Sequence, residues 1–91
     1  MGRITDLQLG EFIASYPRWT VDGEAMSRTF EFADFSQAFG FVTRVAMLAE
    51  RLGHHPDVDI RWNRVTLVLT THSEGGLTTA DTELAAAIEN L

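Results

Sequence analysis

Three histidines are the side chains in this sequence whose type and placement best suit chemistry. His54 and His55 are adjacent and precede Pro56, and His72 lies further along the chain. Imidazole can donate and accept protons near neutral pH, which is the requirement for general acid–base catalysis. We therefore start from the hypothesis that these histidines form an acid–base site.

Other interpretations of the same residues stay open. A His-His pair after a helix is often a capping or surface feature, and three imidazoles could also bind zinc in a hydrolytic site. Adjacent residues in extended chain point to opposite sides, so His54 and His55 could both bind one metal only if the loop departs from a strand. Glu50 lies one helical turn before His54 and could orient an imidazole, or it could pair with Arg51 or Arg44.

Length and composition restrict the remaining possibilities. The chain has 91 residues, with 45% hydrophobic and 22% charged residues, which predicts a single globular domain over residues 1–91. Its net charge of −6 disfavours direct contact with nucleic acid or anionic membranes. It contains no cysteine and no apolar run long enough to span a bilayer. The start of the chain lacks the apolar stretch of a secretory signal, so we expect a soluble, cytoplasmic protein.

The first third of the chain predicts a short helix and a hairpin. The helix begins at Thr5 and Asp6 and must stop at Pro17, which cannot continue the hydrogen-bond ladder. Two alternating segments follow, joined by a turn at Asp22-Gly23. Their apolar residues are Trp19, Val21, Met26, Phe30 and Phe32, and Arg28 is the one polar residue on that side.

A long helix comes next. Asp34 can cap it, with Gln37 placed as in a capping box, and Gly53 ends it. An apolar arc with helical spacing consists of Phe35, Ala38, Phe39, Val42, Val45, Ala46, Ala49 and Leu52. Phe41 and Leu48 lie beyond its edge, so the helix is either deeply buried or offers a second contact surface to another subunit.

The last third predicts a second hairpin and a final helix. Val58, Ile60 and Trp62 alternate, as do Val65, Leu67 and Leu69, with Asn63-Arg64 as the tight connection. Gly75-Gly76 is read as a turn, because the rest of a phosphate-binding loop is absent. A capping box of Thr78 and Asp81 opens a helix through Leu84, Ile88 and Leu91.

The element order is α-β-β-α-β-β-α, which predicts an α+β fold: a four-stranded antiparallel sheet with helices packed on one face. The third strand would start after His54 and His55, and the fourth would end before His72. Antiparallel neighbours place the start of one strand beside the end of the other. We therefore expect the three imidazoles to converge at one sheet edge.

The spacing of these residues resembles the pterin-4a-carbinolamine dehydratase family. The shared pattern is Glu50, three residues, His54-His55-Pro56, an aromatic residue at Trp62, nine residues, His72, then Asp81. The segments FADFSQAFGFVTRVAMLAE, WNRV, LTTH and GGLTTAD are also similar to the family's. The resemblance covers about two-thirds of the chain, from Phe30 to Ile88, and is looser before it, chiefly at Trp19.

The resemblance implies an enzyme, a hydro-lyase that removes water from 4a-hydroxytetrahydropterin in pterin recycling, without metal or other cofactor. His54 and His72 would be the main acid–base groups, and His55 would position the substrate with Pro56. Thr71, Ser73 and Glu74 would contact the substrate around His72. Glu50 and Asp81 would support the site. Trp19 would either form an aromatic wall against the pteridine or pack in the core.

The resemblance also implies partners. The family forms homodimers and homotetramers and serves aromatic amino acid hydroxylases. Members in animals also act as a dimerisation cofactor of a transcription factor, so a non-catalytic assembly module is the alternative function. The wide apolar face that includes Phe41 and Leu48 would serve either kind of contact.

Overall fold

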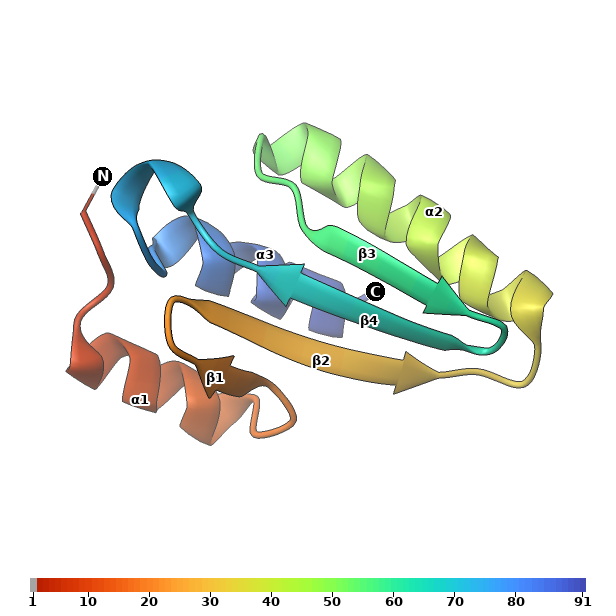
Figure 1. The fold of residues 1–91 in the computed structure, drawn as a ribbon, viewed down its shortest axis with the longest axis horizontal. Helices are drawn as coiled ribbons and strands as arrows, with labels where there is room; N and C mark the ends of the chain where they lie inside the picture. The colour runs from red at the N-terminus through yellow and green to blue at the C-terminus, as the bar shows by residue number, and fades with distance from the viewer. Residues whose placement is uncertain (1) are drawn as a thin grey trace.

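The structure is a computed structural model that describes residues 2–91. The strands form one four-stranded sheet. Figure 1 shows the long middle helix and the C-terminal helix on one side of this sheet, and the N-terminal helix beside its edge. In chain order the elements are α1 (Asp6–Ser15), β1 (Thr20–Asp22), β2 (Ala25–Glu31), α2 (Phe35–Leu52), β3 (Asp57–Arg61), β4 (Arg64–Leu69), the 3₁₀ turn η1 (His72–Glu74) and α3 (Thr79–Glu89). The predicted fold class and element order are confirmed, with η1 as an additional short element.

The sheet is antiparallel, with strand order β1-β2-β4-β3. Its central pair is β2 and β4, whose register joins Arg28 to Leu67. Alternate β4 residues point to the helices, and Val65, Leu67 and Leu69 are fully buried there. The other face is polar, with hydrogen-bonded Thr29 and Thr66 hydroxyls 2.8 Å apart. This pattern explains why helices cover only one face.

The core lies between the sheet and the two covering helices. It includes Trp19, which is 2% exposed and meets the Phe30 ring edge-on with centroids 6.3 Å apart. Of the two interpretations of Trp19, core packing is therefore confirmed, and its ring presents no open face to a ligand. The other large, fully buried side chains include Met26, Leu67, Leu69, Leu84 and Ile88.

The face of α2 that meets the sheet differs from the predicted one. For Phe41 and Leu48, burial and a contact surface were both open; they are 6% and 5% exposed and belong to the core, so burial is confirmed. Phe35 and Phe39, expected inside, are about half exposed. The helix is rotated relative to the prediction because Phe41 fills the space between the Phe30 and Phe32 rings, at centroid distances of 4.7 and 5.0 Å.

The predicted turn positions are each shifted by one residue, in opposite directions. The β3–β4 loop is Trp62-Asn63, so Trp62 leaves the strand and takes a left-handed φ of 49°, while Arg64 starts β4. Asn63 anchors the loop by donating from its side-chain amide to the carbonyl of Phe32 (2.9 Å). The first hairpin turns at Gly23-Glu24 rather than Asp22-Gly23, with the left-handed φ at Gly23.

Two of the helix ends follow the expected local chemistry. The Asp34 carboxylate accepts from the Gln37 backbone N–H (2.8 Å), although the Gln37 side chain accepts from Ala33 instead of closing the box. At α3 the box is complete: Asp81 accepts from the Thr78 backbone N–H (2.9 Å).

Within residues 2–91, none of the helices combines the length and apolar character needed to cross a bilayer.

Candidate active site

The candidate site lies at the sheet edge where β3 begins and β4 ends. Asp57, the first residue of β3, pairs with Val68 near the end of β4. The segment before β3 carries His54 and His55, and the segment after β4 carries Thr71 and His72. Figure 1 shows these two segments at the same end of the sheet, beside the start of α3. The expected meeting of the two loops at one edge is therefore found in the backbone.

His54 is held by a buried carboxylate. Gly53 ends α2 with a left-handed φ of 68°, and the next backbone N–H, of His54, donates to the Ala49 carbonyl (3.2 Å). This turn directs the imidazole inward, where its Nε2 lies 2.6 Å from Asp81 Oδ1. The His54 side chain is 17% exposed and that of Asp81 is fully buried. A carboxylate accepts, so His54 Nε2 carries the proton and Nδ1 is the nitrogen left to exchange a proton.

Asp81 also ties the histidine to the opposite loop. Its Oδ2 accepts from the Thr71 hydroxyl at 2.7 Å and from the Thr78 backbone N–H at 2.9 Å. The Thr71 and Thr78 hydroxyls are themselves 2.9 Å apart. One carboxylate thus joins the helix start, the end of β4 and His54, and its hydrogen bonds fix its orientation. Thr71 and His72 are consecutive, so the same network fixes the backbone at the third histidine.

His55 has a different environment. Its Nε2 is hydrogen-bonded to Glu50 Oε2, and the two side chains are 60% and 76% exposed. Of the alternatives for Glu50, orientation of an imidazole is the one the structure shows, and its partner is His55. The pair lies at a hollow of about 260 Å³ between α2 and β3, which Pro56 and Val58 also line. His55 is the one histidine of the three at this hollow.

The His72 loop is a compact turn. Thr71 and Gly76 form an isolated bridge, with Thr71 N–H donating to the Gly76 carbonyl at 3.1 Å. Gly75 ends η1 in a left-handed conformation, φ 67°, which confirms the predicted turn here. His72 and Ser73 are exposed and Glu74 is half-buried. The His72 imidazole is thus open to solvent at the edge where His54 is enclosed.

The side chains that could bind a metal ion are spread out in the described residues. Across residues 2–91, no three His, Asp or Glu side chains gather closely enough to hold a metal ion. His54 and His55 turn to opposite sides and bind different carboxylates, Asp81 and Glu50. This is the divergence expected for neighbouring residues in extended chain.

The sequence indicates the candidate site residues but not how they are connected. The sequence predicts Asp81 as a helix cap and a supporting residue, and the structure shows that one oxygen accepts from the cap while the other is hydrogen-bonded to His54. The Thr78 hydroxyl, which contacts Thr71, was considered only as a cap. A capping carboxylate 27 positions after a histidine is a weak signal for such a link, because capping alone explains the aspartate.

The chain is similar to a family of known proteins. The profile of the family described as pterin 4 alpha carbinolamine dehydratase matches residues 2–91. The chain belongs to this family. A Chloroflexus aurantiacus protein is 50% identical over 91 residues, covering all of this chain and 98% of the relative, and its name assigns it provisionally as a pterin-4-alpha-carbinolamine dehydratase. An Acidobacterium capsulatum protein with the same provisional name is 48% identical, covering all of this chain and 99% of the relative.

Solved structures show the same fold. A protein from Brucella melitensis described as a transcriptional coactivator/pterin dehydratase superposes with a TM-score of 0.90 at 42% identity, covering 98% of this chain and 97% of the other. A pterin dehydratase-like protein described as a RuBisCO assembly factor of the alpha-carboxysome superposes with a TM-score of 0.65. It is 23% identical, and the match covers 80% of this chain and 84% of the other. The second likeness is one of fold alone.

Proposed function

We propose that this member of the pterin-4a-carbinolamine dehydratase family is a hydro-lyase that removes water from 4a-hydroxytetrahydropterin, with 4a-hydroxytetrahydrobiopterin as the expected substrate. The observation that carries the proposal is the His54–Asp81 pair, in which a buried carboxylate holds an imidazole at 2.6 Å. A carboxylate in this position fixes the tautomer of the imidazole and stabilises its protonated form. Family membership supplies the substrate class.

The proposed reaction needs only proton transfers. The bond between C4a and its hydroxyl oxygen breaks, and that oxygen takes a proton and leaves as water. The ring nitrogen N5 loses its proton, and its electrons form the C4a=N5 double bond of quinonoid dihydropterin. One proton is accepted and one is delivered, so positioned acids and bases suffice and no cofactor is required.

We assign the acid–base roles to His54 and His72, which reach the site from opposite loops. His54 would exchange its proton through Nδ1, because Nε2 is bonded to Asp81. His72 is exposed and follows Thr71, which Asp81 fixes. His55 and Pro56 would position the pteridine, together with Thr71, Ser73 and Glu74 of the second loop. Glu50 would orient His55, with which it is already hydrogen-bonded.

The dehydration of chemically generated 4a-hydroxytetrahydropterin tests the proposal. Wild-type protein should accelerate quinonoid formation over buffer, and the double variant His54→Ala, His72→Ala should return the rate to that of buffer. Loss of general acid–base groups typically costs about 100-fold or more in rate. A matched variant with Glu83→Gln changes an exposed carboxylate on α3 outside the site and should keep the wild-type rate. Equal rates for wild type, double variant and buffer would reject the enzyme.

The biological setting is part of the same proposal. Removal of this water would regenerate the pterin used by aromatic amino acid hydroxylases, so functional coupling to such an enzyme in the cytoplasm is expected. A dehydratase without a hydroxylase in the same cell would contradict that coupling, but not the reaction itself.

We also propose self-association through α2. Phe35 and Phe39 are 49% and 52% exposed and their rings contact each other, with centroids 5.6 Å apart. Val58 on β3 is 45% exposed and lies at the hollow beside this helix. An exposed apolar surface of this kind usually marks an interface. Light scattering should give a dimer or tetramer, and Phe39→Asp should shift it toward monomer. A monomer of about 10 kDa for wild type would reject self-association.

The same surface supports the second candidate function, an assembly module that binds another protein. The Brucella melitensis relative, 42% identical, is described as a coactivator as well as a dehydratase. A defined partner that binds wild type stoichiometrically and loses affinity for the Phe39→Asp variant would favour this role. Dehydratase activity that is unaffected by Phe39→Asp would show that the two roles are separable.

A further inference from the structure

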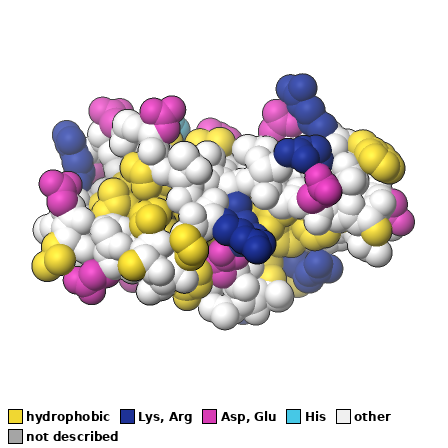
Figure 2. Space-filling model, turned by 90° about the horizontal axis from the view of Figure 1, so that it is seen from below, with side chains coloured by type: hydrophobic (Ala, Val, Ile, Leu, Met, Phe, Trp, Pro, Cys, Tyr) yellow, Lys and Arg dark blue, Asp and Glu magenta, His cyan; other side chains and the backbone are white. Residues whose placement is uncertain are grey.

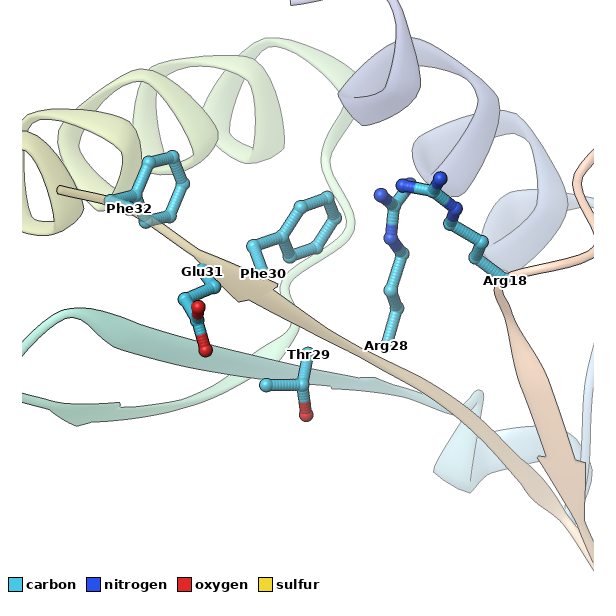
Figure 3. A pocket seen from close by; sticks show the side chains of 6 residues that line it. All are labelled: Arg18, Arg28, Thr29, Phe30, Glu31 and Phe32. Carbon is cyan, nitrogen blue, oxygen red and sulfur yellow. The ribbon is translucent and has the colours of Figure 1, made fainter.

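A second group of polar side chains lies away from the histidines, on the side of β2 that faces the helices. Arg18, from the segment between α1 and β1, and Arg28 of β2 line a hollow of about 500 Å³. They also line an adjoining hollow of about 370 Å³ that reaches the end of α3. Figure 3 shows both arginine side chains extending to the side of β2 on which Phe30 and Phe32 lie, with Thr29 and Glu31 on the other side. Arg28 pairs with Leu67, in the middle part of β4, whereas the histidine loops meet where β4 ends. The hollow is therefore displaced along the sheet from the candidate active site.

Arg18 and Arg28 bring positive charge to this hollow, although the net charge of the whole chain is −6. Arg28 is ion-paired with Glu89, and its side chain is 14% exposed. Arg18 forms no ion pair with any carboxylate of residues 2–91. The carboxylates at the two hollows are those of Glu31 and Glu89. Glu31 is paired with Arg64 at 2.7 Å and Glu89 with Arg28, which leaves the charge of Arg18 uncompensated. Figure 2, which views the molecule from below, shows a basic side chain beside hydrophobic surface near the middle of that face.

Arg28 also has an unused hydrogen-bond donor besides the group that binds Glu89. Arg28 Nε is buried and has no hydrogen-bond partner among the described residues, and the same holds for Trp19 Nε1. Leaving a buried donor unpaired is costly, so an acceptor at this position would be stabilised. A guanidinium presents its N–H groups in a planar fork that matches the two oxygens of a carboxylate.

The hollow has an aromatic component beside this charge. The Arg28 guanidinium lies over the Phe30 ring, 4.2 Å from its centroid, and Phe32 follows on the same side of the strand. Both phenylalanines are half-buried and line the hollow. A flat apolar group could contact these rings while its charge meets the guanidinium groups.

We propose that this hollow is a second ligand site, for a small aromatic carboxylate. The carboxylate is held by Arg18 and Arg28, and its ring lies against Phe30 and Phe32. The site contains none of the dehydratase histidines, so a failure of this proposal would not count against the proposed function.

Titration of ¹⁵N-labelled protein with benzoate tests this site by NMR. Saturable shifts are expected for β2 residues 28–32, and benzyl alcohol, which has the ring without the charge, should produce none. Arg18→Gln should weaken benzoate binding by about 10-fold or more, the effect of losing one charged contact. Arg51→Gln, an exposed arginine on α2, is the matched control and should bind like wild type.

Three results would overturn the proposal. The first is an absence of saturable shifts with benzoate. The second is equal binding by wild type and Arg18→Gln, which would place the ligand elsewhere. The third is inorganic phosphate or acetate binding as tightly as benzoate, which would show an anion site without the aromatic contact. Arg18 is exposed, so Arg18→Gln should leave the fold intact, whereas Arg28→Gln would leave Glu89 half-buried without its partner.

Discussion

Two adjacent histidines of this protein each bind a carboxylate, and the two pairs differ in almost every other respect. His54 meets Asp81 inside the molecule, where the side chains are 17% and 0% exposed. His55 meets Glu50 at the surface, where they are 60% and 76% exposed. A carboxylate–imidazole contact in solvent is weak and interchangeable, whereas a buried one is held in one geometry by its surroundings. Burial therefore separates a fixed pair, which we propose for catalysis, from an adjustable pair, which we propose for substrate positioning.

The largest expected difference between the pairs is in stability. Asp81→Ala removes the acceptor of the Thr71 hydroxyl, the Thr78 backbone N–H and His54 at once. Removing one partner of a buried polar group costs about 3–5 kcal/mol. Urea unfolding should show this loss for Asp81→Ala. An Asp81→Ala protein as stable as wild type would remove the distinction between the pairs.

The next difference is in kinetics. His54→Gln should lower the kcat of dehydration by about 100-fold or more, because an acid–base group is lost. His55→Gln should mainly raise KM, since that side chain is assigned to substrate positioning. Steady-state kinetics of the two variants measure this split. A KM effect for His54→Gln together with a kcat effect for His55→Gln would reverse the assignment.

The smallest effect is expected at the exposed carboxylate. Glu50→Gln keeps the shape of the side chain and removes its charge, and exposed ion pairs are worth about 0.5 kcal/mol. The free energy of unfolding of Glu50→Gln should therefore lie within about 0.5 kcal/mol of the wild-type value. Its KM should change by a few-fold at most. A loss of several kcal/mol would mean that the surface pair is as important as the buried one.

The sequence predicted the features that depend on neighbours along the chain. The cap at Asp34, the helix end at Gly53 and the capping box of Thr78 and Asp81 are formed by residues a few positions apart. The order of elements and the antiparallel hairpins follow from local periodicity. These features were enough to place the two histidine loops at one edge of the sheet.

Features set by tertiary packing could not be predicted in the same way. The apolar residues of α2 span about half of the helix, so the sequence allowed more than one face to meet the sheet, and contact with Phe30 and Phe32 selects Phe41. The His54–Asp81 bond joins residues 27 positions apart, and Arg28–Glu89 joins residues 61 apart. No periodicity encodes such pairs. The left-handed turn at Trp62 was missed because glycine or asparagine normally marks that conformation.

The most direct test of the account is the kcat of dehydration for Asp81→Asn. Asparagine keeps the size of the side chain, but its amide N–H would donate to His54 Nε2 and move the imidazole proton to Nδ1, the nitrogen assigned to proton exchange. We predict a loss of about 100-fold or more in kcat, as expected for a wrong tautomer, while Glu83→Gln retains the wild-type rate. An Asp81→Asn protein that dehydrates the pterin as fast as wild type would contradict the proposal that the buried pair performs the chemistry.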